Sequence, residues 1–343
     1  MPALAQMLTA SDNDHAAVTA AFTARTGLGW HDPTPAAMAA GTVLSVVIPA
    51  HNNAYSLPVV LDALAKQDTS GTVQVIVIDD ASTDDTPAII RLHPAVDTAY
   101  RLPAQVGAAA ARNLGTHLAD ADTVVYLDAD MVLTAHALAD IAVRAHPNLV
   151  QVGFRHNIGY QPGRYLRAEV PAGEPDLHAD HRVRWTPPVG KPMFYTGDVY
   201  HQPMDLRPLD DTHDFVDLGH GARYFDWDLP RMVVTALVAA PRAAVAHVGG
   251  FDPGWTAAGW GAEDTHLGAT LIAAGCKITP LRQLRAWHID APDAAIQWRA
   301  KLASTPARIA YYRHLLGEPA PAQREADLAS RAQALLAHAE VLR

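Results

Sequence analysis

Short apolar runs rich in β-branched residues recur along the first half of the chain. Each run is continuous instead of alternating, which is typical of strands buried on both faces of a parallel sheet. The runs expected to form strands cover residues 43–48, 73–78 and 123–127, and a strand with a weaker apolar pattern is expected at 98–102. Helical patterns predict helices at 56–67, 86–92, 107–119 and 134–145, the last with Thr134 as its N-cap. This alternation predicts βαβ units in an α/β fold, in which ligands bind beyond the carboxyl ends of the strands.

The pattern changes after these units. Residues 156–230 are rich in Pro, Gly, His, Asp and aromatic residues and show little periodicity, so we expect long loops over the sheet. Periodicity then returns, and it predicts a helix at 263–274 and short strands at 277–280 and 284–287.

Both ends of the chain are expected to be helical. Residues 1–40 include one helical face formed by Val18, Ala21 and Phe22. Residues 323–342 carry an apolar stripe of Leu328, Leu335 and Leu342. The simplest interpretation of this stripe is an amphipathic helix that docks on the core.

Composition excludes several classes of protein. With 26 Lys and Arg against 36 Asp and Glu among 343 residues, a nucleic-acid binder with a basic face is not expected. The same charge balance means that a phosphorylated ligand would need a metal ion as its positive partner. The single cysteine, Cys276, excludes an intrachain disulfide and structural zinc bound through several thiolates. The chain has neither a basic, apolar leader nor an apolar stretch of about 20 residues, so we expect a soluble cytoplasmic protein without a membrane span.

The residues that follow the first two predicted strands are polar. Pro49, Ala50, His51 and Asn52 contain no glycine, which argues against a dinucleotide-binding turn. The second strand leads into the sequence DDASTDDT at 79–86. Here we expect Asp80 to contact a base or a ribose, and Asp84 and Asp85 to have structural roles.

The next two segments are suited to phosphate and metal. In GAAAARNLG, at 107–115, Arg112 is the one cation, and it is a candidate partner for a phosphate or a base; a surface arginine is the alternative. The fourth strand leads into Asp128, Ala129 and Asp130. Two acids in this spacing can share Mg²⁺ or Mn²⁺, which prefer oxygen ligands and can bridge a diphosphate.

A second constellation, GWGAED, occupies residues 259–264. Trp260 offers an apolar face to a sugar ring, and Gly261 allows the backbone to approach a ligand closely. Glu263 and Asp264 open a helix and point in different directions, so one can bind a hydroxyl while the other accepts a proton. Helix capping alone would account for the acids but not for the glycines and the tryptophan.

These motifs together resemble family 2 glycosyltransferases. The resemblance covers about residues 43–290 and includes VVIPAHNN, DDASTDDT, GAAAARNLG and LDAD, in that order, followed by GGFD at 249–252. The GWGAED segment is similar to segments of β-1,4-galactosyltransferases and chondroitin-type polymerases. The resemblance implies the GT-A fold, a Rossmann-like, mostly parallel sheet flanked by helices, here with helical N- and C-terminal extensions.

The resemblance also implies roles for individual residues. The donor nucleotide would be bound by Pro49, Ala50, His51, Asn52, Asp80, Arg112, Asp128, Ala129 and Asp130. Asp130 would be the direct ligand of Mn²⁺ or Mg²⁺, with His288 as a further ligand and Asp128 bound to the ribose or to metal-bound water. Asp264 would be the catalytic base. The acceptor would contact Trp260 and Gly261. Glu263 would join Asp264 in the catalytic pair and contact the acceptor or the donor sugar.

The implied reaction is inverting, metal-dependent transfer of a sugar from a nucleotide-sugar donor, a UDP-sugar first of all. The acceptor would be a small molecule, a glycan or a peptide. His51 and Gln105 depart from the family pattern, in which an aromatic residue and Asn are usual, and the segment 297–299 only superficially resembles the Q-x-x-R-W motif of processive synthases. Two alternatives stay open: a non-catalytic nucleotide-sugar or glycan-binding protein, and a nucleotidyltransferase.

On this reading the chain divides into four parts. Residues 1–40 form a helical extension, and residues 41–155 form the nucleotide-sugar-binding half. Residues 156–290 form the acceptor-binding and catalytic half, with long loops, and residues 291–343 form a helical tail.

Overall fold

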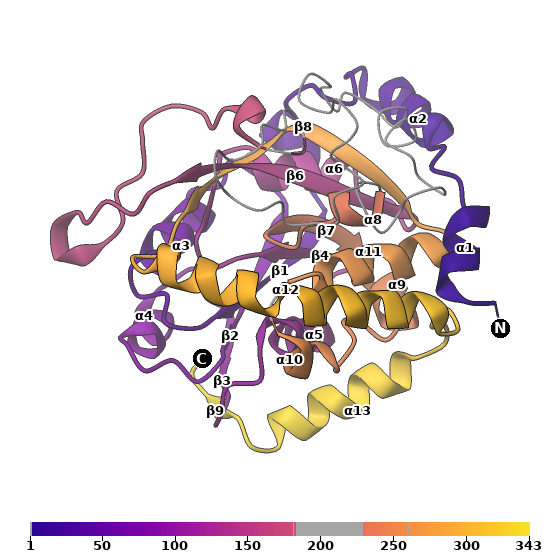
Figure 1. The fold of residues 1–343 in the computed structure, drawn as a ribbon. Coiled ribbons are helices and arrows are strands. Elements are labelled where there is room, and N and C mark those ends of the chain that lie inside the picture. The colour runs from indigo at the N-terminus through magenta and orange to yellow at the C-terminus, as the bar shows by residue number, and fades with distance from the viewer. Residues whose placement is uncertain (1, 181, 183–228, 260) are drawn as a thin grey trace.

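A sheet with helices on both faces forms the centre of the molecule (Figure 1). The computed structural model describes residues 2–180, 182, 229–259 and 261–343. Within these residues the sheet has nine strands in the order β5-β8-β6-β7-β4-β1-β2-β3-β9. The predicted α/β fold is therefore confirmed.

The first half of the sheet is parallel. Its strands match the predicted apolar runs and are β1 (Val43–Ala50), β2 (Thr72–Asp79), β3 (Thr98–Arg101) and β4 (Thr123–Leu127). In this half β1 pairs in parallel with β2 and β4, and β2 pairs in parallel with β3. Because the strands run in one direction, their carboxyl ends meet at one edge, and the polar segments that follow them come together there.

Four helices cover the parallel strands. α3 (Leu57–Ala65), α4 (Thr86–Leu92) and α6 (Ala137–Val143) pack in the apolar cluster that also holds Val46 and Ile48, whereas α5 (Ala108–Leu118) packs in the cluster of Val47. Alternate residues of β1 thus point to opposite faces, as the pleat requires. The α5 helix approaches the sheet closely at Gly115, where a Cβ atom would lie 2.2 Å from Cγ1 of Val47.

The second half of the sheet is mixed. It contains β5 (Met131–Leu133), β6 (Leu149–Ile158), β7 (Leu237–Pro241) and β8 (Lys277–Ile289). β7 is antiparallel to β4 and β6, β5 is antiparallel to β8, and β6 is parallel to β8. The prediction of two short strands at 277–280 and 284–287 was wrong. One strand, β8, runs through both, because Leu281 and Leu284 stay buried and β6 pairs along it on either side of a register shift.

The start of α6 was also predicted wrongly. The helix begins at Ala137 with His136 as its N-cap, two residues later than a cap at Thr134 would give. The preceding residues of β5 pair with Ala286, Trp287 and His288 of β8, so this stretch is extended. Three residues are too few for the hydrophobic pattern to show a strand, and β5 was not expected from the sequence.

The N-terminal extension is helical, as predicted. It comprises α1 (Leu4–Ala10), α2 (Ala16–Thr26) and a 3-10 turn, η1 (Ala36–Ala39). Phe22 of α2 is buried in the cluster that contains α3 and α6. The stretch between β6 and the first gap in the described residues contains two further 3-10 turns, η2 (Arg164–Leu166) and η3 (Leu177–Ala179).

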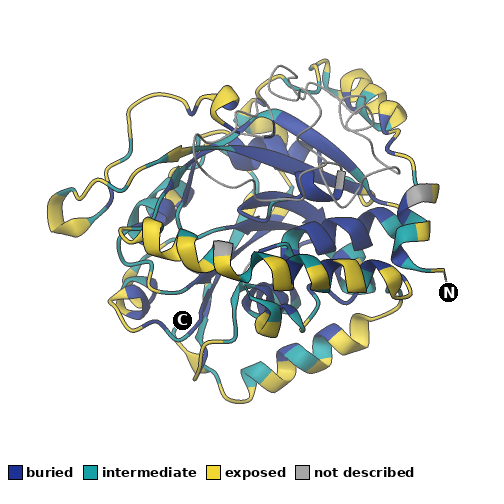
Figure 2. Ribbon diagram, viewed as in Figure 1, coloured by how far each residue is buried: buried dark blue, intermediate teal, exposed yellow. Residues whose placement is uncertain are grey.

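The remaining helices lie around the second half of the sheet and across the site. They are α8 (Leu229–Met232), α9 (Arg242–His247), α10 (Trp255–Ala258), α11 (Glu263–Ala273), α12 (Ala294–Gly317) and α13 (Glu325–Leu336). α12 and α13 present exposed outer faces (Figure 2). Among the described residues, no helix has both the length and the apolar character needed to cross a bilayer.

The C-terminal stripe docks on the core as expected, but the helix that carries it is shorter than predicted. Leu328 and Leu335 of α13 pack toward the α5 side of the sheet. The helix ends at Leu336, and Leu342 follows a short strand, β9 (Glu340–Val341), which pairs with β3. Leu342 therefore belongs to the edge of the sheet, where it packs against the opposite cluster.

Candidate active site

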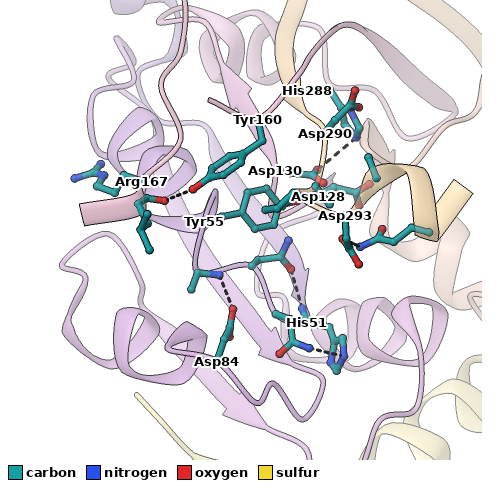
Figure 3. Close-up of a pocket in the computed structure, with 18 of the residues that line it drawn as sticks. His51, Tyr55, Asp84, Asp128, Asp130, Tyr160, Arg167, His288, Asp290 and Asp293 are labelled. Carbon is teal, nitrogen blue, oxygen red and sulfur yellow. Dashed lines mark hydrogen bonds and ion pairs between the residues drawn. The ribbon is translucent and has the colours of Figure 1, made fainter. Parts of the chain in front are cut away.

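A cavity of about 1330 Å³ opens at the carboxyl ends of the strands (Figure 3). A smaller cavity of about 490 Å³ shares its central residues, among them His51, Asp128, Asp130 and Lys301. Two sides of this space are built differently. We call the loops after β1 and β2 (residues 49–54 and 80–86) the β1–β2 wall, and the group of Asp130, Arg155, Asn157 and His288 the β6–β8 wall.

The β1–β2 wall is held together by hydrogen bonds between its two loops. His51 Nδ1 lies 2.6 Å from the carbonyl oxygen of Asp80, and Asn52 N donates to Ser82 Oγ at 2.9 Å. Asn52 has a φ of 55°, and its Oδ1 accepts from Thr83 N at 2.8 Å. Pro49, Ala50 and His51 line the smaller cavity, and Asn52 lines the larger one, so the predicted donor residues do gather at the site.

Asp80 is buried, and both of its carboxylate oxygens accept hydrogen bonds from the backbone. Val106 N donates at 2.7 Å and Gly107 N at 2.8 Å. These bonds fix the turn before α5, where Gly107 has a φ of 92°. Asp80 therefore shapes the smaller cavity that it lines, in addition to any contact with a ligand.

The two acids expected to be structural differ from each other. Asp84 accepts from Ala54 N and from Thr86 N, both at 3.0 Å, so it joins the loops and caps the start of α4. Asp85 is exposed and makes no side-chain capping bond, although it occupies the N-cap position.

Arg112 is buried in a charged group between α5 and α11. Its Nη2 donates to Asp128 Oδ1 at 2.6 Å, its Nη1 lies 3.8 Å from Glu263 Oε1, and its guanidinium lies 5.6 Å from the centre of the Phe251 ring. Burial disfavours the charge, but the two carboxylates outweigh burial and raise the pKa of Arg112. The predicted phosphate partner thus has two carboxylate partners of its own.

Asp130 and His288 form the pair that was predicted to hold a metal. Met131 pairs with His288 across β5 and β8, which brings His288 Nε2 to 3.6 Å from Asp130 Oδ1 (Figure 3). This oxygen is buried and has no hydrogen-bond partner among the described residues. Burial raises the pKa of Asp130, although the neighbouring His288 opposes the shift.

The other nitrogen of His288 is also positioned. Nδ1 lies 2.9 Å from the side-chain amide of Asn157 and 3.7 Å from Asp290 Oδ1. The hydrogen bond with His288 lowers the pKa of Asp290. Asn157 Nδ2 can only donate, so Nδ1 is the acceptor in that bond; a metal ion on Nε2 would require the ring proton on Nδ1 instead, beside the Asp290 carboxylate.

This pair fits a divalent cation, since a buried carboxylate oxygen without a partner faces an imidazole nitrogen. The third predicted ligand does not complete the set. The Asp128 carboxylate is bound by Arg112, and the described residues contain no group of three or more His, Cys, Asp or Glu side chains arranged around a metal position.

The GWGAED segment places its two acids at the start of α11. Glu263 is buried, and its Oε2 accepts from Gly261 N at 2.6 Å. Burial, together with the nearby Asp264, raises the pKa of Glu263 even though a helix N-terminus favours the ionised form. Asp264 is half-buried, and its Oδ1 accepts from Thr265 N at 2.8 Å. Trp260 lies outside the described residues.

Asp264 is the predicted residue that the structure brings least fully into the site. Asp264 is not among the described residues that line the larger or the smaller cavity. Its charge nevertheless acts on Arg112 and Lys301, so it is a neighbour of the charged groups at the back of the smaller cavity.

Three residues at the site were missed in the sequence. Tyr55 lies in the larger cavity with its ring edge-to-face against Tyr160 at 5.6 Å, and burial near Asp130 raises its pKa. Arg155 comes from β6, a strand that was not predicted. Lys301 comes from α12, where Gln297, Lys301 and Ser304 recur at the spacing of one helical face and line the smaller cavity. That spacing was visible in the sequence, but it carries no signal for a cavity.

Comparison with known proteins identifies the family. Residues 45–207 match the family model described as glycosyl transferase family 2. The chain is 32% identical, over 276 residues, to validoxylamine A glucosyltransferase from Streptomyces hygroscopicus subsp. jinggangensis, a match that covers 75% of this chain and 57% of the relative. It is 25% identical to the chondroitin synthase of Escherichia coli, which covers 73% of this chain and 35% of that protein. The chain thus spans little more than half the length of the first of these relatives and about a third of the second.

Solved structures with a similar arrangement include two sugar transferases. The mannosyltransferase PcManGT from Pyrobaculum calidifontis, in complex with GDP-Man and Mn²⁺, has a TM-score of 0.49 and 20% identity, and covers 97% of this chain and 86% of its own. TarS from S. aureus, residues 1–349 with UDP, has a TM-score of 0.44 and 18% identity, and covers 80% and 69%.

The order of the motifs, the sheet that assembles them and the match of residues 45–207 agree. The chain carries a glycosyl transferase family 2 domain on the α/β fold that its sequence predicted.

Proposed function

We propose that the protein transfers a sugar from a UDP-sugar to a hydroxyl of a small-molecule, glycan or peptide acceptor, with inversion and with the help of a divalent metal ion. The observation that carries the proposal is Asp130 Oδ1. This buried oxygen lacks a hydrogen-bond partner among the described residues and faces His288 at the strand ends of a family 2 domain. A buried carboxylate oxygen without a partner is costly, and a metal-bound ligand would satisfy it.

The donor would lie along the β1–β2 wall. The loops of His51, Asn52 and Asp80 are fixed by their mutual hydrogen bonds, so they present a preformed surface to a base and a ribose. Asp130 and His288 would hold Mn²⁺ or Mg²⁺, which would neutralise charge on the departing diphosphate.

The transfer itself would be a single displacement. The acceptor oxygen attacks the anomeric carbon, the bond from that carbon to the β-phosphate oxygen breaks, and the bonding electron pair leaves with UDP. The acceptor proton passes to a carboxylate, for which Asp264 is the candidate. Glu263 is buried beside it and paired with Arg112, so Glu263 is suited to fix the start of α11 and to bind a hydroxyl.

The relatives support a small acceptor and a glucosyl donor as the first substrates to test. Two validoxylamine A glucosyltransferases match about three quarters of the chain at 32% identity. We therefore choose UDP-glucose and validoxylamine A as probes.

The first test is a thermal-shift panel of UDP, GDP, CDP and dTDP with and without Mn²⁺. Binding to the folded state raises the melting temperature by mass action, so UDP with Mn²⁺ is expected to give the one clear shift. A shift with GDP instead of UDP would indicate that the donor is a GDP-sugar. No shift with any nucleotide and metal would contradict the proposal.

The base is tested by Asp264→Asn. General base catalysis contributes about 10²- to 10⁴-fold, so the variant should lose at least about 100-fold in kcat while its UDP affinity stays unchanged. Asp85→Asn, which changes an exposed carboxylate at the rim of the larger cavity, is the control and should keep kcat. A normal kcat for Asp264→Asn would overturn the assignment. UDP binding without hydrolysis or transfer in the wild-type protein would favour a non-catalytic binding protein.

A further inference from the structure

A second buried polar group without a partner faces the same cavity, and it has the opposite charge. Arg155 lies on β6, two residues before Asn157, which pairs with His288 of β8. Because alternate residues of a strand share a face, Arg155 stands on the same side of the sheet as the Asn157–His288 pair and lines the larger cavity with them. Its Nε atom is buried and has no hydrogen-bond partner among the described residues.

A second cation approaches this position from another element. Lys301 lies on α12, which crosses the site in Figure 1, and it lines both the larger and the smaller cavity. Burial lowers the pKa of Lys301, Glu263 and Asp264 act in the opposite direction, and the charge of Arg155 lowers it further. The fold therefore brings two cations from β6 and α12 close enough to repel each other.

The two buried atoms without hydrogen-bond partners suit a ligand that carries both a cation and an anionic group. Asp130 Oδ1 requires a donor or a cation, whereas Arg155 Nε requires an acceptor. The carboxylates of Glu263 and Asp264 act on Lys301, and Arg155 acts on Asp130 and Asp290. A ligand anion between the two cations would offset their mutual repulsion further. A diphosphate bound to a divalent cation presents the metal to Asp130 and His288 and its oxygens to the two cations.

We propose that Arg155 and Lys301 bind the diphosphate of the nucleotide-sugar donor from two sides and stabilise it as the leaving group. This inference rests on the proposed function and adds two residues to it. As the bond between the anomeric carbon and the β-phosphate oxygen breaks, negative charge grows on that oxygen. A guanidinium and an ammonium already in place form charge-assisted hydrogen bonds to it without reorganisation.

The test compares ligands that differ only in the diphosphate. Binding of UDP, uridine and inorganic pyrophosphate, each with Mn²⁺, is measured by calorimetry or NMR for wild type, Arg155→Gln and Lys301→Gln. UDP and pyrophosphate affinity should fall about 10-fold or more in each variant, and uridine affinity should not change. The rate of UDP-glucose hydrolysis at saturating donor should fall as well, because the contacts strengthen as charge develops.

Arg167→Gln is the matched control. Arg167 lines the same cavity, but its guanidinium forms an ion pair with Asp62, so UDP affinity should stay within about twofold of wild type. Melting temperatures of the variants without ligand identify any loss of folding. Arg155→Lys, which keeps the charge, should recover part of the pyrophosphate affinity.

The outcomes separate this inference from the proposed function. Wild type that binds UDP and hydrolyses UDP-glucose, with Arg155→Gln and Lys301→Gln unchanged, would overturn the two cation contacts and leave the transferase proposal standing. Equal loss of UDP and uridine affinity would also overturn them, since it would indicate a general disturbance of the site. Wild type that binds pyrophosphate with Mn²⁺ but no UDP would support the two contacts and refute UDP as the donor nucleotide. Absence of binding to both UDP and pyrophosphate would overturn both proposals.

Discussion

The β1–β2 wall and the β6–β8 wall face the same cavity, but their polar atoms are paired in different ways. On the β1–β2 wall three polar side chains are bound within the protein, whereas Asp85 is exposed at the rim: Asp80 accepts two backbone bonds, Asp84 accepts two, and Asn52 joins one loop to the other. On the β6–β8 wall Asp130 Oδ1 and Arg155 Nε are buried without partners among the described residues.

The difference indicates a division of labour. A wall whose polar atoms are satisfied within the protein is rigid before a ligand arrives, so it is suited to recognising the shape of a nucleoside. A wall with unpaired charges is less stable by itself and gains most from a charged ligand. Substitutions on the first wall should therefore lower the stability of the protein, and those on the second should lower ligand affinity.

The largest effect on stability is expected from the buried group of Arg112, Asp128 and Glu263. Arg112→Met keeps the apolar stem near Phe251 but leaves Asp128 and Glu263 without their cation. Removing one partner of a buried ion pair costs about 3–5 kcal/mol, and the free energy of unfolding in urea at pH 7.5 should fall by that order. The control, Arg167→Met, breaks an ion pair that is about two-fifths exposed and should cost less than about 1 kcal/mol. Equal losses would mean that the Arg112 group is not a buried network.

A substitution on the β6–β8 wall should lower ligand affinity and leave stability unchanged. Burial raises the pKa of the Asp130 carboxyl, which means that its charge is unfavourable in the folded protein. Asp130→Asn removes this charge, so in the absence of ligands the variant should be no less stable than wild type. Its affinity for UDP in Mn²⁺ should fall about 100-fold, which is about 2.7 kcal/mol at 25 °C. Chelation of the metal should weaken UDP binding to wild type by a similar factor and leave the variant unaffected. A variant that binds UDP as wild type does, with the same dependence on Mn²⁺, would remove Asp130 from the metal site.

The sequence predicted the residues of the β1–β2 wall better than those of the β6–β8 wall. The parallel strands β1, β2 and β4 are continuous apolar runs, and the residues after them are adjacent in sequence to the strands that place them. Asp80 could be named because a strand end determines where the next residue lies, and Asp130 is the member of the β6–β8 wall that shares this advantage, since it follows β4.

The β6–β8 wall depends on pairings between distant segments. The three-residue β5 is too short to leave a period, and the position of His288 beside Asp130 is set by the register of β5 on β8. His288 was named through resemblance to a family, since one histidine in a chain with 18 carries little signal. The sequence around Arg155 and Lys301 did not predict that they lie at the site, because only the folded arrangement of β6 and α12 brings them to the cavity.

A buried histidine near the site should make the stability of the protein depend on pH. His266, one turn into α11, is buried, and burial lowers its pKa to about 4 from 6.5, although Asp252 opposes the shift. The unfolded chain therefore binds more protons than the folded chain between these values, so the stabilising contribution is complete above pH 6.5 and is lost as the pH falls toward 4. Between pH 7.5 and pH 5, wild type should lose about 2 kcal/mol of unfolding free energy through this group.

The check is urea unfolding of His266→Gln at both pH values. The variant lacks the titrating group, so its loss of stability on acidification should be smaller than that of wild type by about 2 kcal/mol. Parallel losses in the two proteins would mean that His266 is not kept neutral by burial.

The smallest effect is expected at the rim of the satisfied wall, where Asp84 is more exposed than Asp80. Asp84→Ala removes the acceptor of Ala54 N and Thr86 N, and loss of a cap of this kind costs about 1 kcal/mol. Asp85→Ala, next in the sequence and without a side-chain capping bond, is the matched control and should change stability by less than about 0.5 kcal/mol. Because Asp84 joins the loop after β1 to the loop after β2, its loss should also weaken UDP binding slightly through a less ordered wall, with the dependence on Mn²⁺ unchanged. A change in that metal dependence would instead place Asp84 with the unpaired wall, and the division between the two walls would then be wrong.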